Sequence, residues 1–286
     1  MPKRQLDASW RSWLTENIER QCDPEELFCI LVKNDFSLRS IQESMGDYDP
    51  TRIARPEPAD RASISIDYKA ISEVRLTDPQ KCPQAQRFLS DLIQLYTIDD
   101  FMSDEECNSV CDIICRDLHP STTTDAEREP DKSFRTSSTC ELGWSKDNII
   151  DLIDERIART LGISRSYSEA MQGHYYSIGQ EFKQHTDFFE PGTEVYARYC
   201  AEAGNRTWTF MIYLNDVVRG GGTHFINLNH TFQPKKGTAL IWNNLHANGA
   251  PNYAAFHAGL PVQEGQKVII TKWFRELGSG PMLSPE

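Results

Sequence analysis

The sequence lacks any long apolar run, and this argues against a membrane-spanning helix. An apolar stretch such as Phe28–Val32 has five residues, whereas a span of the bilayer needs about 20. Positive charge is scarce as well, because 30 Lys and Arg residues stand against 42 Asp and Glu, a formal net charge of −12. Such an acidic chain binds the phosphate backbone poorly, so neither a nucleic-acid partner nor a membrane partner is expected.

Cysteine is too sparse for a disulfide scaffold. The 286 residues include eight cysteines, and none of them forms a C-x-x-C pair. Cys107, Cys111 and Cys115 recur every four residues in a predicted helix and are interpreted as small core residues. Ser103 and Glu106 have the spacing of a capping box at the start of that helix. The N-terminus is charged throughout and has no apolar signal-peptide segment, so we expect a reducing, cytoplasmic location.

Composition changes along the chain predict its organisation. Residues 1–50 are expected to form a small helical region, and residues 51–80, rich in Pro, Asp and Arg, a linker. Residues 81–286 are expected to form one domain in which helices, among them one near 84–95 and one at about 148–161, precede short β-rich segments. Helices first and strands afterwards is the α+β pattern, with the strands in a sandwich or barrel.

The sharpest chemical feature is His185-Thr186-Asp187. On a strand, residues i and i+2 point to the same face, so this imidazole and this carboxylate converge. A metal site needs a further ligand from a distant strand, and the downstream candidates are His224, His230, His246 and His257. His257 is favoured, because Gly and Pro turn signals follow it and lead into the β-rich segment that begins at Lys267.

Two histidines and one carboxylate occupy one face of an octahedral metal and leave three positions open, as in non-haem Fe(II) oxygenases. A lysine beside such a site would pair with the far carboxylate of a dicarboxylic keto acid whose near end chelates the metal.

From about residue 98 to residue 276 the sequence resembles the Fe(II)/2-oxoglutarate-dependent dioxygenases of the prolyl 4-hydroxylase type. The similarity runs through FMSDEEC, RTSS at 135–138, MQGHYYSIGQEFKQHTDFF at 171–189, RTWTFMIYLNDVVRGGGTHF at 206–225, KKGTALIW at 235–242 and HAGLPVQEGQKVIITKW at 257–273. The resemblance implies a double-stranded β-helix (jelly roll) core flanked by helices, with a small N-terminal helical extension.

The resemblance also implies roles for individual residues. It implies iron ligation by His185, Asp187 and His257. Lys267 matches the lysine that binds the distal carboxylate of 2-oxoglutarate, Tyr176 matches a tyrosine whose hydroxyl reaches this co-substrate, and Thr209 lies on a strand that lines the same pocket. Four residues fall at positions near the substrate peptide in related enzymes: Arg135, Ser137, Glu169 and Trp273.

The implied reaction is hydroxylation of an unactivated C–H, with release of succinate and CO₂. The implied cofactors are Fe(II), 2-oxoglutarate and O₂, with ascorbate as a candidate reductant, and the favoured substrate is a prolyl residue in a protein or peptide. In related enzymes the loop that corresponds to residues 190–205 closes over the substrate, and we expect the same here.

Two departures from the family pattern leave other functions open. Phe182 stands where peptide-hydroxylating relatives have a tyrosine, and Arg275 stands where some relatives have a histidine. An arginine at the pocket would capture a carboxylate, so one alternative is hydroxylation of a free amino acid or small metabolite. A second alternative is a non-catalytic jelly-roll protein that binds a partner or acts as a sensor.

Four further histidines are expected to have structural and not chemical roles. His224 is interpreted as a packed strand residue, and His174, His230 and His246 as surface or loop residues.

Overall fold

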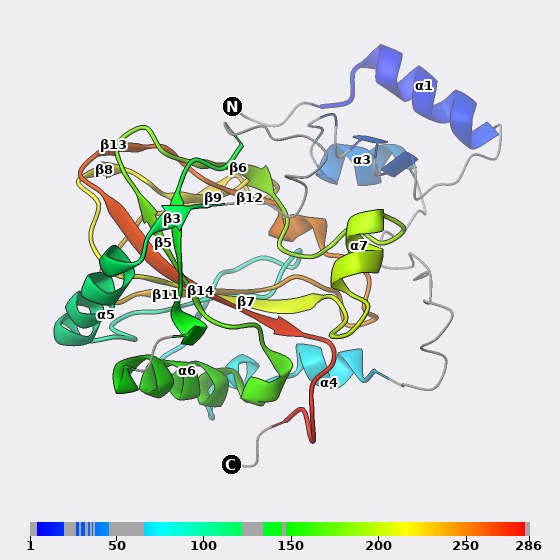
Figure 1. The fold of residues 1–286 in the computed structure, drawn as a ribbon. Coiled ribbons are helices and arrows are strands. Elements are labelled where there is room, and N and C mark those ends of the chain that lie inside the picture. Colours follow the sequence, from blue (N-terminus) through cyan, green and yellow to red (C-terminus); the bar gives the residue numbers. More distant parts are fainter. Residues whose placement is uncertain are drawn as a thin grey trace.

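The computed structural model describes residues 5–19, 27–28, 30–31, 34, 36, 38–45, 66–121, 134–144 and 147–283. Figure 1 shows three layers, in which a small sheet lies above a large sheet and α6 lies below it. The large sheet has the strand order β1-β2-β11-β7-β14-β5-β4-β3, and the small sheet has the order β10-β9-β12-β6. All strand pairs in these sheets are antiparallel.

The strands of the large sheet are β1 (Gln86–Arg87), β2 (Leu95–Ile98), β3 (His119–Pro120), β4 (Ser138–Glu141), β5 (Gln172–Tyr176), β7 (Arg206–Tyr213), β11 (Ala239–Asn243) and β14 (Lys267–Arg275). The small sheet contains β6 (Phe182–His185), β9 (Thr223–Phe225), β10 (His230–Phe232) and β12 (His257–Gly259). A separate pair joins β8 (Arg219–Gly220) to β13 (Val262–Glu264).

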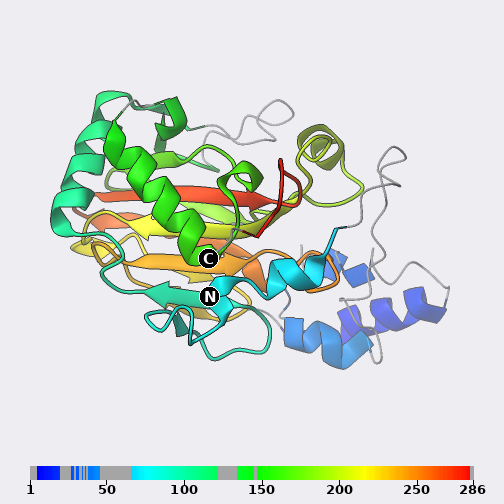
Figure 2. The ribbon, with the colours of Figure 1, turned by 90° about the horizontal axis from the view of Figure 1, so that it is seen from below.

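The described α-helices are α1 (Ala8–Glu19), α3 (Leu38–Met45), α4 (Tyr68–Ser72), α5 (Asp104–Arg116), α6 (Asn148–Leu161) and α7 (Glu194–Tyr199). The short 3₁₀ helices are η2 (Arg75–Thr77), η3 (Leu142–Trp144), η4 (Arg165–Tyr167) and η5 (Tyr253–Ala255). Figure 2 shows α6 lying across the large sheet, with α5 beside it. Within the described residues, no helix has both the length and the apolar character that crossing a bilayer requires.

The central strand β7 connects the two cores of the sandwich. Successive side chains on a strand point to opposite faces of the sheet. Trp208, Phe210 and Ile212 therefore join the core on the side of α5 and α6. Met211 and Tyr213 join the core between the two sheets. Because both faces of β7 are covered, all of its residues after Arg206 are buried, and it ends in the apolar run Phe210–Tyr213.

Local sequence explains where the two long helices begin and end. At the start of α5 the predicted capping box is present, because the Ser103 hydroxyl accepts from the Glu106 amide at 3.2 Å and the Ser103 amide donates to the Glu106 carboxylate at 2.9 Å. At the end of α6, Gly162 adopts the left-handed conformation with φ 85°, which glycine reaches without steric cost.

The predicted helix near 84–95 is wrong. This segment contains β1 and leads into β2, and β2 pairs with β11 at the edge of the large sheet. Leu89, which a helix would have buried, is 94% exposed. Pairing with a sheet edge has therefore overridden the local helical pattern.

The interpretation of the three helix cysteines as core residues is correct for Cys107 and incorrect for Cys115. Cys107 is buried, Cys111 is half-buried and Cys115 is exposed. The reason is that four-residue steps exceed the helical repeat of 3.6 residues, so the row rotates away from the core face.

The chain before the jelly roll packs onto it in two places. Leu14, Phe28 and Leu31 belong to the core between the sheets, and the Phe28 ring lies 5.4 Å from the Tyr253 ring. The predicted linker over residues 51–80 is described only from Ile66 onward, and there Ile71 is buried in the other core.

We expect Ser103→Ala to lower the free energy of unfolding by about 1 kcal/mol, because it removes the side-chain cap of α5. Urea denaturation followed by circular dichroism measures the change. Ser109→Ala is the matched control, since Ser109 is an exposed position inside the same helix and alanine is favourable there. Equal stability of Ser103→Ala and the wild-type protein would contradict this assignment of the cap.

Candidate metal centre and its pocket

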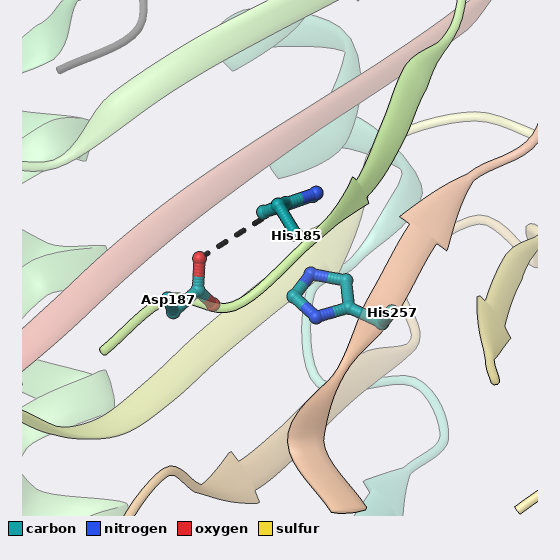
Figure 3. Close-up of side chains that lie close together, drawn as sticks. All are labelled: His185, Asp187 and His257. Atoms are coloured by element: carbon teal, nitrogen blue, oxygen red, sulfur yellow. Dashed lines mark ion pairs between the residues drawn. The ribbon is translucent and has the colours of Figure 1, made fainter. Parts of the chain in front are cut away.

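His185, Asp187 and His257 meet at one end of the small sheet (Figure 3). The antiparallel pairing of β6 with β12 places His185 directly opposite His257, and Asp187 follows two residues after the end of β6. One ligand atom from each of the three side chains lies within 4.8 Å of the others. The predicted triad is thus brought together, and it is the single cluster of this kind in the described part of the chain.

Hydrogen bonds set both imidazoles in the tautomer that suits a metal ligand. His185 Nδ1 lies 2.7 Å from the Lys183 carbonyl, and His257 Nδ1 lies 2.8 Å from the Ala255 carbonyl. A carbonyl only accepts, so each Nδ1 carries the hydrogen and each Nε2 presents a lone pair. Burial lowers the pKa of both histidines, and the neutral form is the one that binds a metal.

Thr209 holds the carboxylate of the triad. Its hydroxyl donates to Asp187 Oδ2 at 2.7 Å and accepts from Asn244 Nδ2 at 2.9 Å. The Thr209 side chain is fully buried and does not line the pocket, so its contact in the structure is with Asp187. Such a contact orients a metal ligand from behind.

The donor set fits a divalent iron ion. Two neutral imidazoles and one carboxylate form the facial set of non-haem Fe(II) oxygenases, which leaves positions for exchangeable ligands. The three side chains also line a pocket, and Tyr176 and Lys267 lie on its wall.

Lys267 places an ammonium group inside this pocket. It is 2% exposed, and its Nζ lies 5.1 Å from the centre of the Tyr176 ring and 5.7 Å from that of Tyr213. Among the residues that the structure describes, no carboxylate pairs with it. Burial lowers its pKa from 10.5 to about 7. A buried cation without a counter-charge is costly, so the pocket favours an anionic ligand at this point.

Arg135 and Ser137 both contact the Tyr176 hydroxyl, but only Arg135 lines the pocket. The Arg135 guanidinium lies over the Phe182 ring at 4.6 Å. Ser137 is buried behind it and accepts from Arg135 Nε at 3.2 Å. In this geometry Ser137 does not line the pocket but holds Arg135, which does.

Trp273 lines the pocket, whereas Glu169 does not. The Glu169 carboxylate accepts from Arg206 at 2.6 and 2.7 Å and from Arg275 at 2.7 Å. Burial alone would raise the pKa of Glu169, but the two arginines lower it overall. The predicted direct contact of Glu169 with substrate therefore has no support here; its partner Arg206 covers the outer side of Trp273 at 3.9 Å.

Arg275 has a structural role instead of facing the pocket. It is 8% exposed, and it donates to the carbonyls of Tyr199 and Gly204 in addition to Glu169. These bonds anchor the segment that contains α7. The alternative in which Arg275 captures a substrate carboxylate therefore loses its support, because most of its N–H donors bind Glu169 and the carbonyls of Tyr199 and Gly204.

His174 is the pocket residue that the sequence analysis missed. The prediction of a surface or loop position is wrong, since His174 is 2% exposed and lines the pocket. The available signal was its position two residues before Tyr176, which puts both side chains on the same face of β5. The other expectations hold in part, because His230 is exposed while His224 and His246 are half-buried.

A sequence model of the 2OG-Fe(II) oxygenase superfamily matches residues 171–275. Prolyl 4-hydroxylase subunit alpha-3 of Mus musculus is 36% identical over 193 residues, which make up 66% of this chain and 35% of that protein. Prolyl 4-hydroxylase subunit alpha-1 of Rattus norvegicus is 32% identical over 198 residues, 68% of this chain and 37% of that protein. Residues 171–275 therefore form a 2OG-Fe(II) oxygenase domain, and the chain is similar to prolyl 4-hydroxylase subunits. It spans about a third of the length of these curated relatives.

The fold of this oxygenase domain matches a solved structure. Viral collagen prolyl hydroxylase from Paramecium Bursaria Chlorella virus-1, determined as a 2OG complex, has a TM-score of 0.51 and 24% sequence identity. The match covers 64% of this chain and 96% of that one. The predicted α+β jelly-roll core is confirmed, and the superfamily uses Fe(II), 2-oxoglutarate and O₂.

We expect Thr209→Val to weaken Mn²⁺ binding about tenfold, because the Asp187 carboxylate loses the hydroxyl that orients it. Isothermal titration calorimetry of the purified protein with Mn²⁺ measures this affinity. Thr207→Val is the matched control on the same strand, since the buried Thr207 hydroxyl has no hydrogen-bond partner among the described residues. Equal Mn²⁺ affinities for Thr209→Val and Thr207→Val would contradict the role of Thr209.

Proposed function

We propose that the protein is an Fe(II)/2-oxoglutarate-dependent dioxygenase that hydroxylates a prolyl residue in a protein or peptide and releases succinate and CO₂. The observation that carries this proposal is the position of Lys267. Its buried ammonium, which has no carboxylate partner in the described residues, lines the same pocket as the His185–Asp187–His257 triad. A metal triad and a lone cation in one cavity suit a keto acid with a second carboxylate.

Each group of pocket residues would have its own role in the reaction. His185, Asp187 and His257 would hold the iron, which when bound supplies the oxidation of 2-oxoglutarate by O₂. Lys267 would bind the distal carboxylate of 2-oxoglutarate, with the Tyr176 hydroxyl beside it. The apolar side chains of the lining, Met211, Trp242 and Ile269 among them, would exclude water from the reacting groups.

A peptide substrate is favoured over a free amino acid. The main support for a small substrate was Arg275, and its donors bind the backbone around α7 and Glu169 instead. The curated relatives described above are prolyl 4-hydroxylase subunits. Trp273, with Arg206 stacked on it, presents a broad aromatic wall on which a proline-containing segment would pack.

The test is 2-oxoglutarate turnover by the full chain with Fe(II) and a panel of proline-rich peptides and free amino acids. We expect succinate release coupled to a peptide mass increase of one oxygen atom, located on proline by fragmentation. His185→Ala, which removes one ligand, is expected to abolish both signals. Turnover with a free amino acid and with none of the peptides would overturn the substrate assignment, and absence of Fe(II)-dependent succinate release would overturn the enzymatic one.

We also expect 2-oxoglutarate binding to take up about one proton at pH 8.5. With its pKa lowered to about 7, Lys267 is mostly neutral at this pH, and a bound dicarboxylate favours its charged form. Affinity should therefore fall about tenfold for each pH unit above 7.

Calorimetry with Mn²⁺ present, in buffers of different ionisation enthalpy, counts the protons. Lys267→Arg keeps its charge at every pH used, so it is expected to bind without proton uptake. The same uptake in both proteins would rule out Lys267 as the group that titrates.

A further inference from the structure

His174 lies inside the active-site pocket and has no part in the function proposed so far. It occupies the middle of β5, where it pairs with Ile269 of β14 on one side and Thr139 of β4 on the other. Its Nδ1 lies 2.9 Å from a terminal nitrogen of Arg135. The same Arg135 nitrogen lies 3.4 Å from His174 Nε2. A guanidinium only donates, so at least one ring nitrogen carries a lone pair and the imidazole is neutral.

The hydroxyl groups of Ser137, Ser121 and Thr139 form a second hydrogen-bonded connection between Arg135 and His174. Arg135 Nε donates to Ser137, whose oxygen lies 2.8 Å from that of Ser121. The Ser121 oxygen lies 2.6 Å from that of Thr139, which lies 3.2 Å from His174 Nδ1. Donation from Arg135 Nε through Ser137 and Ser121 to Thr139 gives each of these hydroxyls a partner, and Thr139 in turn lies beside His174 Nδ1.

Arg135 links this hydrogen-bonded connection to the metal site on the opposite sheet. Its guanidinium lies 4.6 Å from the centre of the Phe182 ring. The Phe182 ring is stacked on His185, with centroids 3.5 Å apart and planes 17° apart. Arg135 also contacts the Tyr176 hydroxyl. One guanidinium therefore touches both the stack that supports a metal ligand and the tyrosine beside Lys267.

We propose that His174 is a positioning residue that holds the Arg135 guanidinium in place, so that Arg135 presses Phe182 onto His185 and orients the Tyr176 hydroxyl. This inference rests on the proposed function, because it assigns His174 a role in metal and 2-oxoglutarate binding.

The test compares His174→Leu with His174→Asn. Leucine removes the acceptor at similar bulk, whereas the asparagine side-chain oxygen replaces Nδ1 as an acceptor for Arg135. We expect His174→Leu to weaken 2-oxoglutarate binding about tenfold and Mn²⁺ binding severalfold, both measured by calorimetry on the full chain. His174→Asn should recover most of both affinities. His224→Leu is the control, since His224 is a half-buried strand histidine that bonds Thr231 and does not line the pocket.

A double-mutant cycle with Arg135→Met separates positioning from general loss of structure. If His174 acts through Arg135, His174→Leu should have little further effect on 2-oxoglutarate affinity when Arg135→Met is present. Full additivity of the two substitutions, or equal binding by His174→Leu and the wild-type protein, would overturn the inference while leaving the proposed function intact. Failure of the wild-type protein to bind Mn²⁺ and 2-oxoglutarate would overturn both.

Discussion

The pairing of two short antiparallel strands is the constraint on which the site depends. Because β6 and β12 run side by side, His185 and His257 stand opposite each other although 72 positions separate them in the sequence. Asp187 joins them because the chain leaves β6 immediately after His185. The covering sheet then supplies Thr209 behind the carboxylate. Each ligand is thus oriented by a backbone carbonyl or a buried hydroxyl.

Asp187 and Lys267 both line the pocket, and each would be neutralised by a bound group of opposite charge. Both triad histidines are neutral, because burial lowers their pKa. Asp187 offers a negative charge to a metal, while Lys267 offers a positive charge on the wall of the same cavity. Further out, Glu169 and two arginines bond one another. The cavity therefore suits a cation and an anion together.

Motifs with short-range spacing were predictable, because their geometry depends on the local backbone. The capping box at Ser103 follows from its local spacing, and the two-residue spacing of His185 and Asp187 brings them together although Asp187 lies just beyond the end of β6. Contacts with remote partners were not predictable from the sequence. The hydroxyl of Thr209 binds Asp187, and Arg275 binds backbone carbonyls near α7. The predicted helix near 84–95 is wrong for the same reason, because β1 forms by pairing with β2, and β2 pairs with β11.

By itself the sequence determined the metal-ligand types, the lysine and the family resemblance, since these are properties of residue identity and order along the chain. The tertiary structure alone decided which polar side chains face the cavity and which form hydrogen bonds that stabilise its walls. His174 illustrates the difference: its sequence neighbours are ordinary for a strand, and only the fold brings Arg135 within hydrogen-bonding distance of its ring. Hydrogen bonds act over about 3 Å, so their partners are set by the packing of sheets and not by position in the sequence.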